Sequence, residues 1–236
     1  MEASLYAAFG LGLILGTQHA LDADHVIAVS TIVTEHRSFR WASLIGAFWG
    51  LGHTVTLFMV GLLVIGLRLT IPIRLALGLE LLVALMLVFL GVSILWRSFR
   101  QRRLHAHTHA HNPETHIHFH LHERSEEDHS HAHPFRAMRK PFVVGMVHGL
   151  AGSAALMLLV LTTIPSPLAG LAYIVIFGIG SVGGMLVLSS MIAVPLVLTA
   201  RRFTLLNGWI RILAGGASIA FGFILGWEIL FQQGLY

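Results

Sequence analysis

Apolar runs, each long enough for a helix of about 20 residues to cross a bilayer, alternate with short polar segments along most of the chain. The pattern predicts six spans, at residues 3–30, 41–67, 75–96, 141–163, 168–200 and 208–231. The fifth run is too long for one straight helix and contains Pro195 and several glycines, which predict a break or kink. We therefore expect an all-α polytopic membrane protein with six transmembrane helices.

Composition agrees with this pattern. Of the 236 residues, 56% are hydrophobic and only 11% are charged, with a mean hydropathy of +0.78. Soluble domains carry charge on about a quarter of their residues. The chain has no cysteine, which excludes disulfides, thiol redox chemistry and thiolate metal sites.

One polar tract, residues 97–140, divides the chain into a first membrane unit (1–96) and a second (141–236). It has few apolar residues to bury, so we expect it to be disordered. Histidine-rich tracts bind divalent transition metals with little discrimination, which favours a role in metal buffering. Its eleven histidines are His105, His107, His109, His111, His116, His118, His120, His122, His129, His131 and His133.

The basic residues are distributed asymmetrically. With six spans, 13 of the 15 Lys and Arg fall in loops on one side of the membrane, and only Arg68 and Arg74 fall on the other. Because cytoplasmic loops are enriched in Lys and Arg, both termini are expected outside and the histidine-rich loop in the cytoplasm. The positive charge thus sets topology in the cytoplasmic membrane and does not indicate nucleic-acid binding.

The two membrane units resemble each other. Residues 14–21 align with 143–150 at an offset of 129, and the Gly-Leu-Gly of residues 50–52 aligns with Gly-Ile-Gly of 178–180. Because each unit has an odd number of spans, the second unit has the opposite orientation in the membrane to the first. Two inverted three-helix repeats are a transporter architecture with a binding site near midplane.

Ionisable residues inside the spans are the candidate chemistry, because each costs several kcal/mol in hydrocarbon. The segment 18–25 carries four of them, and counting about 1.5 Å per helical residue puts two more histidines from other spans at a similar depth. Imidazoles and carboxylates without thiolates suit Ni²⁺, Co²⁺ or Zn²⁺. The predicted metal ligands are His19, Asp22, Asp24, His25, His53 and His148.

The positions within segment 18–25 also constrain its backbone. On a straight helix His19, Asp22 and His25 share one face, whereas Asp24 points away from it. The helix is therefore expected to bend near residues 20–23, or Asp24 to have a partner on another span.

The sequence resembles the nickel/cobalt transporter (NiCoT) family. His19 to His25 matches that family's H-x4-D-H signature, and Leu51-Gly52-His53-Thr54 resembles the start of its second signature. The resemblance implies that His19, Asp24, His25 and His53 recognise the metal. Classical members have eight spans and further acidic residues in the second motif, so this chain is more similar to six-span urease-accessory-type or efflux-type members with a histidine-rich loop.

We therefore expect a secondary permease for Ni²⁺ and/or Co²⁺ and not an enzyme, with import favoured and no tightly bound cofactor. The chain lacks the phosphate-binding loop of an ATPase and the H-E-x-x-H of a metalloprotease. The alternatives are a proton-coupled Ni²⁺/Co²⁺ efflux protein, a membrane metal sensor, or an enzyme of another class. Expected partners are the metal ion, the lipid bilayer and cytoplasmic metallochaperones for urease or hydrogenase.

Overall fold

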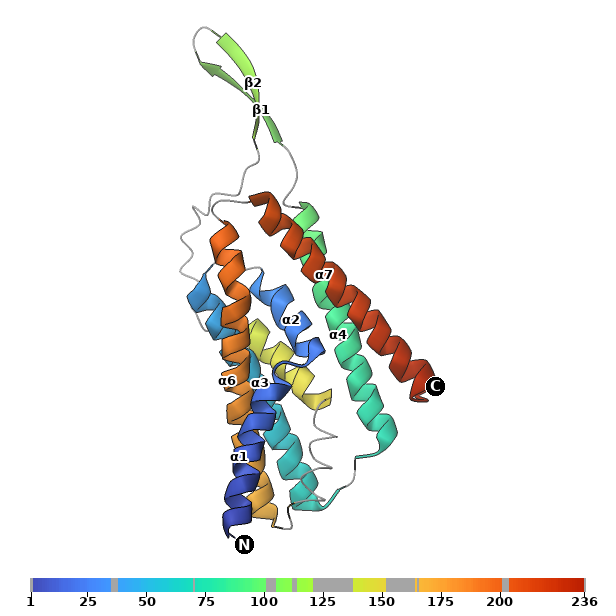
Figure 1. Ribbon diagram of the computed structural model, residues 1–236. Helices are drawn as coiled ribbons and strands as arrows, with labels where there is room; N and C mark the ends of the chain where they lie inside the picture. Colours follow the sequence, from blue (N-terminus) through green and yellow to red (C-terminus); the bar gives the residue numbers. More distant parts are fainter. Residues whose placement is uncertain are drawn as a thin grey trace.

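The computed structural model describes residues 2–34, 38–69, 71–100, 105–111, 114–120, 138–151, 164, 166–200 and 204–235. A further helical segment covers residues 138–151. The labelled helices of Figure 1 are α1 (Glu2–His19), α2 (Ala23–Val33), α3 (Phe39–Leu67), α4 (Ile73–Arg100), α6 (Pro167–Ala200) and α7 (Thr204–Trp227), and α7 continues as the π-helix η1 (Glu228–Gln232).

Four of the described helices are long and apolar enough to cross a membrane: α3, α4, α6 and the combined α7–η1. The protein is therefore a helical membrane protein. The first predicted span is divided into α1 and α2, and the fourth is described only as far as residue 151. The count of six spans stays a prediction.

Helix α6 corrects one expectation, because it runs without interruption from Pro167 to Ala200 although Pro195 lies inside it. Its glycines serve close packing instead. A Cβ atom on Gly180 would overlap the carbonyl oxygen of Leu13 in α1, and one on Gly178 would overlap the side chain of Thr54 in α3. Small residues that let two backbones approach are common between membrane helices.

The helices form two groups that meet at α2. Helix α6 packs against both α1 and α3, while α4 and α7 pack against each other as an antiparallel pair (Figure 1). The short helix α2 touches α3, α4, α6 and α7, so it joins the groups. Its side chains Val29, Ile32 and Val33 are buried in the main hydrophobic core together with Ile45 and Trp49 of α3.

The chain leaves helical geometry between His19 and Ala23, as segment 18–25 predicted. The amides of Leu21 and Asp22 bond back only three residues, to Gln18 and His19 at 2.8 and 3.1 Å. Asp22 then adopts φ −59° and ψ 147°, an extended conformation that ends the turn, and α2 begins at the next residue. The predicted bend is confirmed as a full break.

Two pairs of helices cross through matching glycine contacts. A Cβ atom on Gly16 would overlap the carbonyl of Phe177, and one on Gly180 that of Leu13, where α1 meets α6. The segment 138–151 meets α3 in the same way, through Gly145 against Trp49 and Gly52 against Phe142. Each residue of the first crossing lies 128 or 129 positions from its counterpart in the second.

The histidine-rich tract contains a two-stranded antiparallel hairpin of β1 (His105–His111) and β2 (Glu114–His120), beyond the end of the helices in Figure 1. The expected disorder of the tract stays a prediction, because residues 101–104, 112–113 and 121–137 lie outside the described residues. Alternate positions hold Thr, Ala, Ile or Phe between the histidines, and such a period of two favours strands. The division at residues 97 and 140 stays a prediction, although α4 extends to Arg100 and the next helix includes residue 138.

Candidate metal centre

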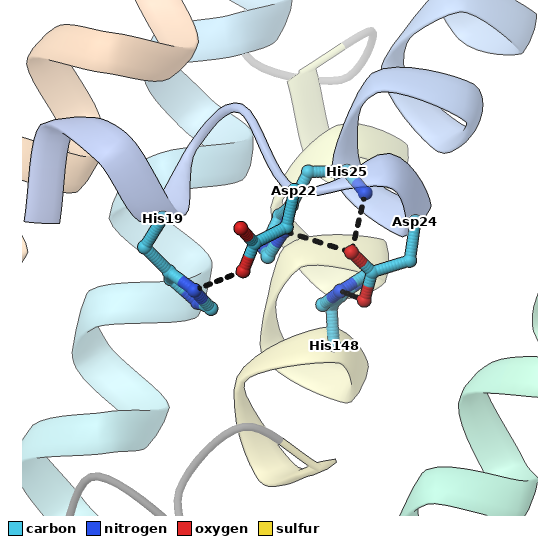
Figure 2. A network of polar contacts seen from close by, with 5 residues as sticks. All are labelled: His19, Asp22, Asp24, His25 and His148. Carbon is cyan, nitrogen blue, oxygen red and sulfur yellow. Dashed lines mark hydrogen bonds and ion pairs between the residues drawn. The ribbon is translucent and has the colours of Figure 1, made fainter.

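Four segments bring one polar residue or more to the break between α1 and α2. His19 is the last residue of α1, Asp24 and His25 open α2, His53 lies in the middle of α3, and His148 belongs to segment 138–151. Figure 2 shows four of these side chains, with Asp22, converging from different elements. The chain has five histidines outside the histidine-rich tract, and four of them meet here.

The convergence is close enough for a single ion to touch several side chains. His19, His25 and His53 offer one nitrogen each within 4.8 Å of one another, and so do the ligand atoms of Asp24, His25 and His148. Two ligands on opposite sides of one metal ion are about 4.2 Å apart, twice a usual metal–nitrogen bond. Both sets are thus close to the spacing of ligands around one ion, and His25 belongs to both.

Two carboxylates orient two of the imidazoles. The Nδ1 atom of His19 lies 2.7 Å from Oδ2 of Asp22, and Nε2 of His148 lies 2.9 Å from Oδ2 of Asp24 (Figure 2). Asp24 also accepts a hydrogen bond of 2.9 Å from the backbone N–H of His25. A carboxylate on one ring nitrogen fixes the imidazole and leaves the other nitrogen for a metal.

Several ring nitrogens have no hydrogen-bond partner among the described residues. His25 and His53 are 0% exposed and His148 is 2% exposed. Both nitrogens of His25, both of His53 and Nδ1 of His148 are buried without a hydrogen bond. A buried polar atom without a partner costs about 1–3 kcal/mol, so a ligand such as a metal ion at these nitrogens would offset a cost that the described residues leave unmet.

Aromatic rings support two of the histidines in corresponding ways. The ring of Phe177 lies 5.4 Å from that of His19, and the ring of Trp49 lies 5.8 Å from that of His148. Trp49 and Phe177 each precede one of the aligned Gly-x-Gly motifs by one residue. We did not predict these aromatic residues, but extending the alignment by one position would have found them.

A cavity of about 200 Å³ lies against one side of this cluster. Its lining residues come from both groups of helices and include an acidic residue of α4 that we did not predict as a ligand. They are His19, Asp24, His25, Glu80, Val83, His148, Ala151 and Leu225.

The predicted ligands thus meet in space, although not all in one role. Asp24 does have a partner on another segment, His148, and it also lies beside His25. Asp22 lies against Nδ1 of His19 and is 55% exposed, so it is placed to orient His19, and its role as a metal ligand stays a prediction.

The histidines of β1 and β2 lie away from this cluster, beyond the end of the helices (Figure 1). Seven of the eleven histidines of the tract belong to β1 and β2, and three pairs face each other across the register: His105 with His120, His107 with His118, and His109 with His116. His111 pairs with Glu114. The remaining four, His122, His129, His131 and His133, lie outside the described residues.

Comparison with known proteins agrees with the membrane fold. The chain is 36% identical to the urease accessory protein UreH of Bacillus sp. (strain TB-90) over 235 residues, which covers 100% of this chain and 97% of the relative. This chain belongs to the UreH family. UreH is an accessory protein and not an enzyme, as expected from the sequence. No family profile and no solved structure matches the chain.

Membership of the UreH family bears on the resemblance to nickel/cobalt transporters. It supports the urease-accessory type among the two six-span types that the sequence resembled. The name of the relative describes that protein, and not this chain, as a urease accessory protein.

Proposed function

We propose that this protein is a secondary permease that moves Ni²⁺ and/or Co²⁺ across the cytoplasmic membrane, inward, and that Zn²⁺ can occupy the same site. The observation that carries the proposal is the set of buried imidazole nitrogens without hydrogen-bond partners around His25. The membrane potential, worth about 2.3 kcal/mol per charge for each 100 mV, drives a divalent cation inward without another coupling ion.

Charge balance supports a divalent cation as the substrate. Asp22 and Asp24 bring two negative charges to the break in the first span, and within the described residues no Lys or Arg lines the adjacent cavity. A divalent ion bound between neutral imidazoles compensates both carboxylates. Imidazole ligands favour Ni²⁺, Co²⁺ or Zn²⁺ over Mg²⁺ and Ca²⁺, which prefer oxygen ligands.

The relative's name favours nickel among these metals, because a urease accessory role suggests nickel handling. It also favours import, since cytoplasmic metallochaperones for urease or hydrogenase would receive the ion inside the cell.

The proposed mechanism uses two inverted three-helix repeats with the metal at their interface. The matched crossings support this arrangement: Gly16 against Phe177 and Gly180 against Leu13 recur as Gly145 against Trp49 and Gly52 against Phe142. Inverted repeats allow one half to rock against the other and to expose the site to either side in turn.

We further propose that both termini are outside and that the hairpin, on the cytoplasmic side, buffers the metal. Its register supports buffering, because three cross-strand histidine pairs follow one another at two-residue intervals on one face of the ribbon. Directly opposed residues in a hairpin have Cβ atoms about 5 Å apart, within the span of one metal ion and two imidazoles.

Radiolabelled Ni²⁺ and Co²⁺ flux into proteoliposomes tests the proposal. We expect uptake that follows an imposed potential, negative inside, and that falls to background in His25→Ala, since His25 belongs to both ligand sets. His36→Ala, a histidine that the sequence places between the first two predicted spans, is the matched control and should transport as the wild type does. A flux that required a proton gradient and ran outward would instead favour the efflux alternative, and undiminished flux in His25→Ala would refute the metal site.

A further inference from the structure

The cavity beside the metal cluster has an acidic wall that the proposed site does not use. Glu80 and Val83 of α4 both line it, opposite the cluster residues. They are three residues apart and therefore share one face of the helix. This face of α4 is turned toward the cavity, and Leu225 of α7 completes the same wall.

Glu80 is a carboxyl group inside an apolar span without a compensating cation. Among the residues that the structure describes, Glu80 makes no hydrogen bond and no ion pair. The residues of α4 on both sides of it are rich in leucine. Two further carboxylates are close to it in the fold: Asp24 of α2 lines the same cavity, and Glu228 belongs to η1, which contacts α4. An ionisable residue in a span that faces a cavity marks an ion pathway more often than a structural contact.

A second observation points to a metal ion in the same cavity. His25 and His148 also line it, both are at least 98% buried, and each has a ring nitrogen without a hydrogen-bond partner among the described residues. The cavity therefore has oxygen ligands on the α4 wall and nitrogen ligands on the cluster wall.

We propose that Glu80 is the entry ligand of the pathway: a partly hydrated divalent cation binds the Glu80 carboxylate in the cavity and then passes to the imidazoles of His25 and His148. Water occupies about 30 Å³ per molecule in the liquid, so a cavity of about 200 Å³ accommodates a cation with several of its waters. The cation exchanges these waters for nitrogen ligands at the second step. This inference rests on the metal site of the proposed function.

The rate at which nickel reaches the cluster tests the role of Glu80. Trp49 is fully buried and its ring lies 5.8 Å from that of His148, so Ni²⁺ bound at the cluster should quench its fluorescence. The measurement is stopped-flow mixing of the purified full-length protein with NiCl₂. Trp49→Phe identifies the part of the signal that comes from this tryptophan.

We expect Glu80→Gln to slow the association of Ni²⁺ by about tenfold, at the lower end of the effect of charged clefts on cation arrival. The equilibrium affinity should change less than the rate, and Glu80→Asp should restore most of the rate. Glu2→Gln is the matched control, because Glu2 carries the same charge but opens α1, 17 residues before the cluster residue His19. Its association rate should stay within about twofold of the wild type.

Equal association rates in Glu80→Gln and the wild type would overturn the inference. So would complete loss of equilibrium binding in Glu80→Gln with unchanged circular dichroism, because Glu80 would then be a permanent ligand. The measurement does not depend on transport, so the two proposals fail separately. If Ni²⁺ quenches the fluorescence of Trp49 in the wild-type protein but no flux is measured, only the permease is refuted. If Ni²⁺ does not change the fluorescence of Trp49, the entry pathway and the metal site are refuted together.

Discussion

The buried cluster and the hairpin use the same side chain in opposite ways. In the cluster, four histidines come from four separate segments, and each has different neighbours: Asp22 beside His19, and Asp24 beside His148. In the hairpin, histidines repeat at equivalent positions along two adjacent strands. Convergence of distant segments defines one site with one geometry, whereas repetition along a ribbon provides many similar sites. The difference predicts that the buried cluster discriminates between metal ions and that the hairpin binds many ions with little discrimination.

The sharpest test of this difference is Asp24→Asn, which keeps the shape of the side chain and removes its charge. Asp24 contacts both His25 and His148, so its loss disturbs the ligand set and the charge balance together. Loss of such a carboxylate partner typically costs about 10- to 100-fold, and we expect the upper end for Ni²⁺ flux in proteoliposomes. Asp24→Glu should recover less than half of the loss. Normal flux in Asp24→Asn would show that the cluster works without this charge.

A smaller loss is expected when the backbone that holds His19 is displaced. A Cβ atom on Gly180 would overlap the carbonyl of Leu13 in α1, whereas one on Gly183, in the same helix, meets nothing within 4 Å among the described residues. Overpacking of this kind costs about 1–3 kcal/mol. Gly180→Ala should therefore lower the thermal stability and the Ni²⁺ affinity, and Gly183→Ala should change neither, as measured by melting in detergent and by nickel titration. Equal behaviour of the two variants would contradict the close packing of α1 on α6.

Asp22→Asn should have a milder effect than Asp24→Asn, because Asp22 orients His19 from the outer side and is half-exposed to the surroundings. We expect the affinity for Ni²⁺ to fall by less than about tenfold, below the usual range for buried partners of metal ligands. Isothermal titration of the two variants side by side measures the difference. A larger loss in Asp22→Asn would instead make Asp22 a direct ligand.

The smallest effect on transport is expected from the hairpin. Replacing its six paired histidines with serine should leave Ni²⁺ flux at saturating concentration within about twofold, since capacity for metal in a buffer does not set the turnover of a separate site. The amount of Ni²⁺ bound per protein at equilibrium should fall clearly. Replacement of Thr108 and Thr115, at the intervening positions, by alanine is the control and should leave both quantities unchanged. A large loss of Ni²⁺ flux would show that the hairpin takes part in transport.

The break in the first span could be predicted from the sequence because few arrangements satisfy segment 18–25. His19 and Asp24 cannot face one ion from a straight helix, so either a break or a distant partner was required. The structure has both, the break at residues 20–22 and His148 as the partner of Asp24. That His148 was this partner could not be predicted, because pairing across 124 residues depends on how α3 and segment 138–151 cross.

Helix α6 and the hairpin show where sequence patterns were ambiguous. Glycines such as Gly178 and Gly180 can weaken a helix or allow close contact with its neighbours, and the sequence alone favours neither. Here the neighbours Leu13 and Thr54 decide the matter. In the hairpin, the composition of the tract predicts disorder while the alternation of histidine with Thr, Ala, Ile and Phe predicts strands, and the described residues 105–111 and 114–120 follow the alternation.

The separation of α1 from α2 also gives the site an electric polarity. The peptide dipoles of a helix leave about half an elementary charge at each end, negative at the C-terminus and positive at the N-terminus. His19 is the last residue of α1, so the negative end of α1 faces the candidate metal site, while Asp24 lies in the first turn of α2, at the positive end of that helix. A continuous helix would cancel these two ends against each other. The break therefore exposes two helix ends of opposite sign inside one apolar span: a negative end that attracts a cation and a positive end that anchors the carboxylate beside it.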